Sequence, residues 1–181
     1  EKYQKLLSYV IFNNPLKKLT LANLPKEIYS QSNLWKYGIS GDLPIILVKI
    51  EDLNDMYVVQ DILKAHEFFR SKDIRCDVVI LNNEQNSYDQ YVNYEIENAI
   101  LNKQIEYLKN ISGGIFVINK NQIEKEDIEL LEFKANVIIN AKYGDIITQI
   151  NDLEEEYLKE LKNVGLDVKP EYIFQNENSS I

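Results

Sequence analysis

The chain has 181 residues and a net charge of −9 at pH 7; 45% of its residues are hydrophobic and 27% are charged. This length is enough for one domain with a proper core, and the composition is that of a globular protein. Arginine is scarce, occurring only at Arg70 and Arg75. Binding to nucleic acid or to an anionic membrane surface depends on clustered basic side chains, so we expect neither partner.

The single cysteine, Cys76, excludes an internal disulfide and a multi-cysteine metal site, and we expect neither a metal nor a cofactor. No apolar run approaches the roughly 20 residues of a membrane helix. The chain starts at Glu1 without a signal-peptide pattern, and we expect a cytoplasmic segment of a longer protein.

Residues 1–33 carry a short amphipathic pattern that stops at Pro15, and we expect a helical arm leading to a neighbouring domain. Four runs rich in β-branched residues follow, over residues 44–50, 76–81, 114–118 and 135–139. Runs of this kind are typical of strands buried on both faces. Helical patterns separate or follow the strands, over residues 54–72, 88–109, 122–134 and 144–162.

This alternation of strands and helices predicts an α/β fold over residues 34–150, with a four-stranded, all-parallel, doubly wound sheet of Rossmann-like or flavodoxin-like type. We expect the strand order 2-1-3-4. Residues 151–181 are predicted to hold the charged end of the last helix, followed by an extended linker tail over residues 163–181.

The loop from Gly38 through Gly41 to Asp42 has the glycines of a phosphate-binding loop. However, it precedes the first strand, whereas ligands in open α/β sheets bind at the carboxyl ends of the strands. It also lacks the lysine of a P-loop, and Asp42 adds negative charge. We therefore interpret Gly38, Gly41 and Asp42 as a structural turn.

His66 lies at helical spacing with Ile62 and Phe69, which favours a packed histidine over a catalytic base. No nucleophile with a suitable local pattern accompanies it. Because arginine is scarce and the net charge is −9, we also expect no pocket for a phosphate dianion.

Polar side chains follow each predicted strand and should gather at the carboxyl edge of the sheet. Amides, carboxylates and a tyrosine ring there suit a ligand rich in hydroxyl groups. The candidate ligand-binding residues are Asn82, Asn83, Tyr88, Lys142 and Asp145. Glu51, Asp52, Glu84 and Asp145 could pair as acid and base, but the sequence does not fix their separation.

Several stretches resemble the cyclic β-1,2-glucan synthase family. The longest is residues 34–50, which reads LWKYGISGDLPIILVKI; shorter matches follow at residues 63–69, 77–84 and 113–117, and one precedes it at residues 10–15. The resemblance covers roughly residues 6 to 150. Lys36 and Lys49 depart from the Arg or His and the Arg that the family pattern suggests.

The resemblance implies a place between carbohydrate-binding β-sandwich units and ahead of an α-barrel similar to cellobiose phosphorylase. Such proteins polymerise glucose from a nucleotide sugar in an enzyme anchored in the inner membrane, or phosphorolyse 1,2-β-oligoglucans as soluble phosphorylases. Neither the barrel nor the transferase motif matches this chain, so no catalytic residue is carried over.

Two hypotheses remain open at this point. In the first, the chain is a non-catalytic module that orients carbohydrate-binding and catalytic domains of the same polypeptide. In the second, it binds a small ligand or β-1,2-glucan at the carboxyl edge of the sheet.

Overall fold

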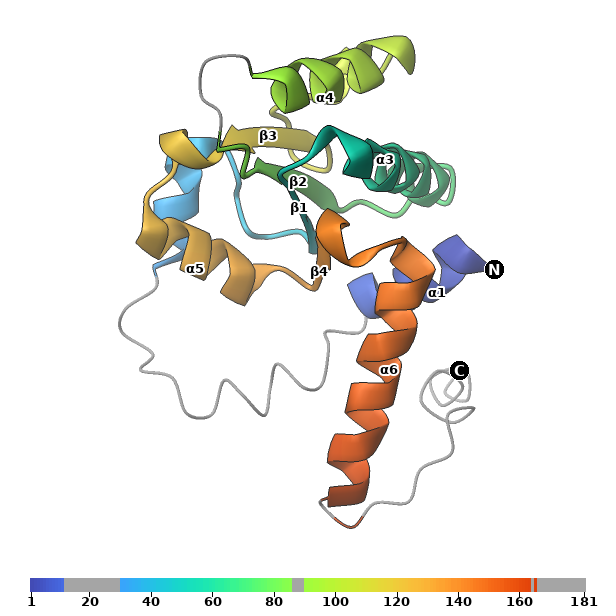
Figure 1. The fold of residues 1–181 in the computed structure, drawn as a ribbon. Helices are drawn as coiled ribbons and strands as arrows, with labels where there is room; N and C mark the ends of the chain where they lie inside the picture. Colours follow the sequence, from blue (N-terminus) through green and yellow to red (C-terminus); the bar gives the residue numbers. More distant parts are fainter. Residues whose placement is uncertain (12–29, 86–89, 164, 166–181) are drawn as a thin grey trace.

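The computed structural model describes residues 1–11, 30–85, 90–163 and 165. Its centre is a four-stranded sheet of β1 (Ile45–Ile50), β2 (Asp77–Asn82), β3 (Ile115–Asn119) and β4 (Val137–Asn140). The strands lie in the order β3-β2-β1-β4 and every pair is parallel (Figure 1). The predicted all-parallel, doubly wound α/β fold is therefore confirmed.

The predicted strand order, 2-1-3-4, is wrong. The chain adds β2 and then β3 on one side of β1, and then crosses back to place β4 on the other side. Both orders satisfy the preference for right-handed crossovers, so the pattern of strands and helices does not distinguish them. The observed order puts the change of winding direction between β1 and β4, where open α/β sheets form a crevice.

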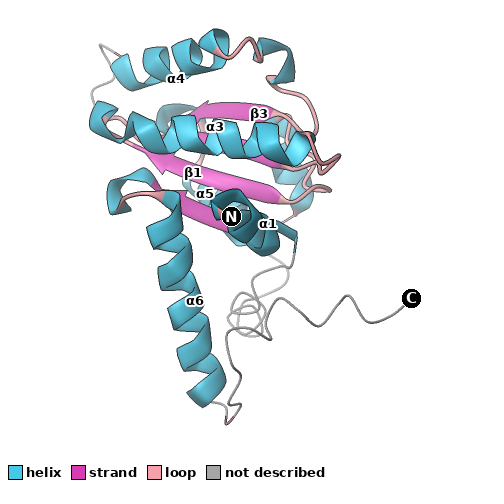
Figure 2. Ribbon diagram, turned by 90° about the vertical axis from the view of Figure 1, so that its right-hand side faces the viewer, coloured by secondary structure: helices cyan, strands magenta, loops and turns pink. Residues whose placement is uncertain are grey.

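Helices cover both faces of the sheet (Figures 1 and 2). The larger hydrophobic cluster joins one face to α1 (Lys2–Ile11), α3 (Met56–Arg70), α4 (Tyr91–Asn102) and α6 (Ile146–Asn163). The smaller cluster joins the other face to α5 (Lys125–Lys134) and the short 3-10 helix η1 (Gln31–Tyr37).

The strand sequences explain the two clusters. Along β1, Ile46 and Val48 belong to the larger cluster, whereas Ile45 and Leu47 belong to the smaller one. Successive side chains of a strand point to opposite faces, so a continuous apolar run is needed when both faces are covered. The same alternation holds along β2, where Val78 and Ile80 face α3 and its neighbours.

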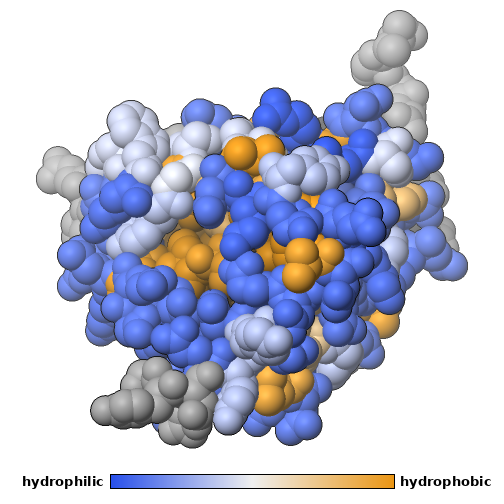
Figure 3. Space-filling model, turned by 90° about the horizontal axis from the view of Figure 1, so that it is seen from above, coloured by the Kyte–Doolittle hydropathy of each residue, from blue (hydrophilic) through white to orange (hydrophobic). Residues whose placement is uncertain are grey.

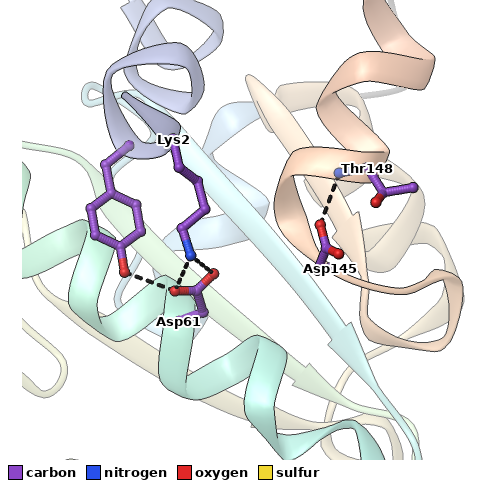
Figure 4. A network of polar contacts seen from close by, with 5 residues as sticks. Lys2, Asp61, Asp145 and Thr148 are labelled. Carbon is purple, nitrogen blue, oxygen red and sulfur yellow. Dashed lines mark hydrogen bonds and ion pairs between the residues drawn. The ribbon is translucent and has the colours of Figure 1, made fainter.

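Helix α1 packs against the sheet domain through both apolar and charged contacts. Leu6 and Val10 are fully buried in the larger cluster. Lys2 Nζ lies 2.8 Å from Asp61 in α3, and the Tyr3 hydroxyl donates to the same carboxylate at 2.7 Å (Figure 4). Burial and this hydrogen bond raise the pKa of Tyr3 to about 12. Whether residues 1–33 also lead to a neighbouring domain stays a prediction.

A buried hydrogen-bond network of His66, Gly113 and Asp77 joins α3, β2 and the turn before β3. His66 Nε2 is 3.0 Å from the carbonyl oxygen of Gly113, and the Gly113 N–H donates to Asp77 Oδ1 at 2.7 Å. His66 and Asp77 are 1% and 0% exposed, respectively. Burial lowers the pKa of His66 and raises that of Asp77. His66 is thus a packed, hydrogen-bonded helix residue, as its spacing predicts.

Candidate functional site

A cleft of about 870 Å³ opens at the carboxyl edge of the sheet, where the loops after β1, β2 and β4 meet. This is the crevice that the change of winding direction between β1 and β4 creates. The polar residues that line it are Glu51, Asp52, Asn54, Asp55, Glu84, Gln85 and Lys142. Four carboxylates and one ammonium group therefore face a shared space.

The loop after β1 is shaped by its own side chains. Asp52 Oδ1 accepts a hydrogen bond from the Asn54 backbone N–H at 2.8 Å, which starts the 3-10 turn Leu53–Asp55 ahead of α3. Short polar side chains favour this geometry because they satisfy backbone donors that the turn leaves free. The Asp52 carboxylate is thus engaged in holding the wall of the cleft.

The loop after β4 brings the positive charge. Asn140 Oδ1 accepts from the Lys142 backbone N–H at 3.2 Å, and Lys142 Nζ lies 3.4 Å from Glu51 Oε1 across the cleft. Behind the loop, the Gln149 side chain donates to the carbonyl oxygens of Asn140 and Gly144 at 2.9 and 2.7 Å. Gln149 therefore fixes the path of the chain from β4 into α6.

Asp145 has a structural role at the start of α6. Its Oδ1 accepts from the Thr148 backbone N–H at 2.9 Å, the geometry of a helix N-cap (Figure 4). That backbone hydrogen bond lowers the pKa of the Asp145 carboxyl. A general acid needs a raised pKa, so Asp145 is unsuited to that role.

A smaller hollow of about 220 Å³ lies beside the first, at the ends of β2 and β3. Glu84 and Gln85 line both, and side-chain amides of Asn82, Gln90, Asn119 and Asn121 add to the second. Asn82 is 4% exposed; its Nδ2 donates to Asn119 Oδ1 at 3.1 Å and its Oδ1 accepts from the Glu84 N–H at 2.9 Å.

The structure therefore separates the five sequence-based candidates. Lys142 lines the larger cleft and Asn82 the smaller hollow, whereas Asp145 caps a helix. Asn83 lines neither; its backbone N–H continues the sheet pairing by donating to the Ile50 carbonyl oxygen at 2.7 Å. Tyr88 lies outside the described residues.

Asn54, Asp55 and Gln85 were missed by the sequence reasoning, although they line the clefts. Asn54 and Asp55 follow β1 within one short turn, and Gln85 follows Glu84 directly after β2. Their position just past a strand end was the available signal, because parallel strands end at one edge.

The cleft offers several kinds of hydrogen-bonding group. Among residues 1–11, 30–85, 90–163 and 165, no three His, Cys, Asp or Glu side chains are arranged to hold a metal ion. Seen from the α4 side, the surface of the molecule is largely hydrophilic, with hydrophobic residues showing in several areas between the hydrophilic ones (Figure 3). Carboxylates, amides and one ammonium group can together bind a ligand that carries many hydroxyl groups.

The glycine loop before β1 lies at the opposite, amino edge. Gly38 and Gly41 have φ angles of +79° and +74°, and Gly38 caps η1 by donating to the Trp35 carbonyl oxygen at 2.9 Å. The Asp42 N–H donates to Ser40 Oγ at 3.2 Å. These contacts are those of a structural turn, since positive φ angles favour glycine.

The longest family-like stretch, residues 34–50, also makes structural contacts. Lys36 Nζ lies 2.7 Å from Asp127 in α5, and the Tyr37 hydroxyl donates to the same carboxylate at 2.7 Å. Lys49 pairs with Glu132 of α5. Lys36 therefore joins η1 to α5, and Lys49 joins β1 to α5.

In the part of the chain that the structure describes, no helix is both long and apolar enough to span a membrane.

Comparison with known proteins gives one clear similarity, while no family model matches the chain. The chain is 27% identical over 172 residues to the cyclic beta-(1,2)-glucan synthase NdvB of Rhizobium meliloti (strain 1021). This match covers 92% of the chain but only 6% of NdvB, so the chain is similar, over nearly all of its length, to a small segment of a cyclic β-1,2-glucan synthase.

Proposed function

We propose that this chain is a non-catalytic α/β module of a multidomain β-1,2-glucan protein, in which it orients carbohydrate-binding and catalytic domains. The observation that carries this proposal is the unequal coverage of the match to NdvB, which includes 92% of this chain but only 6% of the synthase. A discrete sheet domain thus corresponds to a small part of a very long protein. Rigid domains of this kind set the distance between their neighbours.

The contacts at the carboxyl edge support this role. Asp52 and Asp145 are engaged by backbone N–H groups, and the Glu84 carboxylate accepts from the Val92 N–H at 3.3 Å near the start of α4. Hydrolysis or phosphorolysis of a glycosidic bond needs a carboxyl group held protonated as an acid. For Asp145, the backbone hydrogen bond from Thr148 instead lowers the pKa of the carboxyl, which favours its ionised form.

The isolated chain is therefore expected neither to hydrolyse linear β-1,2-glucan nor to release glucose 1-phosphate from it in the presence of phosphate. The measurement is product release over hours at micromolar protein, with and without phosphate. The E51Q variant, altered at a carboxylate that lines the cleft, is the control for a contaminating enzyme. Phosphate-dependent turnover by the native chain that is lost in E51Q would make the carboxyl edge an active site and contradict the proposal.

A second candidate function is binding of glucan at the carboxyl edge. It is favoured by the two adjoining hollows, about 870 and 220 Å³, which share Glu84 and Gln85. Side-chain amides both donate and accept hydrogen bonds, so they match hydroxyl groups of either orientation. Exposed Tyr91 and Tyr143 are the sequence neighbours of Val92 and Lys142 in the cleft wall, and such rings can stack on sugars.

Titration calorimetry with linear β-1,2-glucans, glucose 1-phosphate and a nucleotide sugar tests this second function. Glucan binding predicts saturable heat with the oligosaccharide alone, weakened about tenfold or more in Q85A because its amide borders both hollows. K125A, an exposed substitution on α5, is the matched control and should bind as the native chain does. Absence of heat with all three ligands leaves only the orienting role.

A further inference from the structure

The amino edge of the sheet holds a separate cleft of about 350 Å³, beside the C-terminal end of α3 and the turn before β3. Both arginines of the chain, Arg70 and Arg75, line it. The rest of the lining is Asp73, Ile74, Leu108, Ile111, Ser112 and Gly113. In a chain with a net charge of −9, this is a local concentration of positive charge.

Neither arginine is neutralised by a carboxylate in direct contact. Within the described ranges every ion pair has a lysine as its cation. Arg75 donates from Nη2 to the Ser112 carbonyl oxygen at 2.9 Å, which uses one of its five N–H groups. Arg70 Nη1 is buried and has no hydrogen-bond partner in the described part of the chain.

The side chains are also held in place. The Arg70 guanidinium carbon lies 5.6 Å from the centre of the exposed Tyr107 ring, a cation–π arrangement. Gly113 has a φ of +79°, and a Cβ there would come within 3.0 Å of Arg75 Nε. A glycine at this point therefore leaves room for the Arg75 side chain along the wall.

Two features oppose an anion. Asp73 contributes one negative charge to the wall, and the C-terminal end of α3 presents the negative end of the helix dipole. Asp77, which accepts from Gly113, lies behind the wall and interacts electrostatically with Arg75. Among the residues that line the cleft, two guanidinium groups face one carboxylate, that of Asp73.

We propose that this cleft binds an oxyanion, the carboxylate or phosphate group of a small molecule, between the guanidinium groups of Arg70 and Arg75. The planar guanidinium fork matches two oxygens of either group, and Arg70 and Arg75 present two such forks to the same cleft. Leu108 and Ile111 offer an apolar wall to the rest of the ligand. The scarcity of arginine had suggested no such pocket, but the fold brings the two arginines together.

Thermal unfolding of the full chain is measured with inorganic phosphate, with acetate, and with sodium chloride at matched ionic strength. At least one of the two oxyanions should raise the Tm above the chloride control, because a ligand that binds only the folded state stabilises it. The R75Q variant should weaken that binding by about tenfold or more. Arg75 is exposed, so R75Q should fold normally.

K72Q is the matched control, since Lys72 is an exposed cation near the same helix end but does not line the cleft. It should retain the oxyanion effect within about twofold, as expected for loss of a screened surface charge. A response to phosphate alone or to acetate alone identifies the group that is bound. No response to either oxyanion, or equal responses in R75Q and the native chain, overturns the proposal. The proposed orienting role does not depend on this cleft and is unaffected by this outcome.

Discussion

Replacing Gly114 with Ala is expected to destabilise the fold by about 3 kcal/mol or more, at the upper end of what an added methyl group does in a packed site. The new Cβ would lie 2.0 Å from the Leu108 carbonyl oxygen and 2.9 Å from that of Ile111. Both obstacles are backbone atoms, which no side-chain rotation can move. The turn that leads into β3 would have to shift, and the hydrogen-bond network of His66, Gly113 and Asp77 would shift with it.

Urea unfolding of the native chain and of G114A measures this difference. The matched control is G41A, in which the same substitution meets a backbone φ of +74°. Conformational strain alone should lower the free energy of unfolding by about 1 kcal/mol there. A G114A variant no less stable than G41A would show that the segment before β3 can relax, and that close packing does not fix it.

The strands and helices were predictable because their patterns are local. The run at residues 44–50 is apolar at every position but Lys49, and only a strand covered on both faces needs that pattern. The strand order was not predictable, because it depends on how helices pack across the sheet. Only the paired strands themselves place β4 beside β1 and β3 at the far edge.

The candidate site was predictable at the level of the edge, not of the side chain. Any parallel sheet gathers its post-strand residues at one edge, so Lys142 and Asn82 were found. The role of Asp145 depends on whether its carboxylate reaches the Thr148 N–H, a distance that composition does not contain. The arginine cleft was missed because two arginines in 181 residues are too few to suggest a cationic site. Their proximity depends on the fold, in which Arg70 packs against Tyr107 and Arg75 against Gly113.

The two edges of the sheet thus carry opposite electrostatic characters. The carboxyl edge gathers Glu51, Asp52, Asp55 and Glu84 around one lysine, whereas the amino edge gathers both arginines. A neutral, hydroxyl-rich ligand suits the first edge, and an oxyanion suits the second. Experiments at one edge therefore leave the other as an internal control.

Lowering the pH from about 7.5 to 5.5 is expected to destabilise the chain through His66, the single histidine of the sequence. Burial, together with the nearby charge of Arg70, lowers the pKa of the folded imidazole; the hydrogen bond to the Gly113 carbonyl oxygen opposes this only in part. The unfolded imidazole titrates near its ordinary value of about 6.5. Below that pH the unfolded state binds a proton that the folded state resists, so the free energy of unfolding falls as the pH falls.

The size of this effect is limited by one proton, or about 1.4 kcal/mol per pH unit, until the folded pKa is reached. Asp77 acts in the opposite direction: its raised pKa means that the folded carboxyl takes up a proton at a higher pH than the unfolded one, which favours folding as the pH falls. The measurement is therefore urea unfolding between pH 5.5 and 7.5 for the native chain, H66Q and D77N.

The difference in stability between the native chain and H66Q isolates the histidine, because a glutamine amide can still donate to Gly113 and does not titrate. That difference should shift against the native chain by about 1 kcal/mol as the pH falls across the range. In D77N the opposing carboxyl is gone, so the histidine slope should appear at full size. If the difference in the free energy of unfolding between the native chain and H66Q does not change with pH, His66 has the same pKa in the folded and unfolded states. Water would then reach the imidazole inside the hydrogen-bond network.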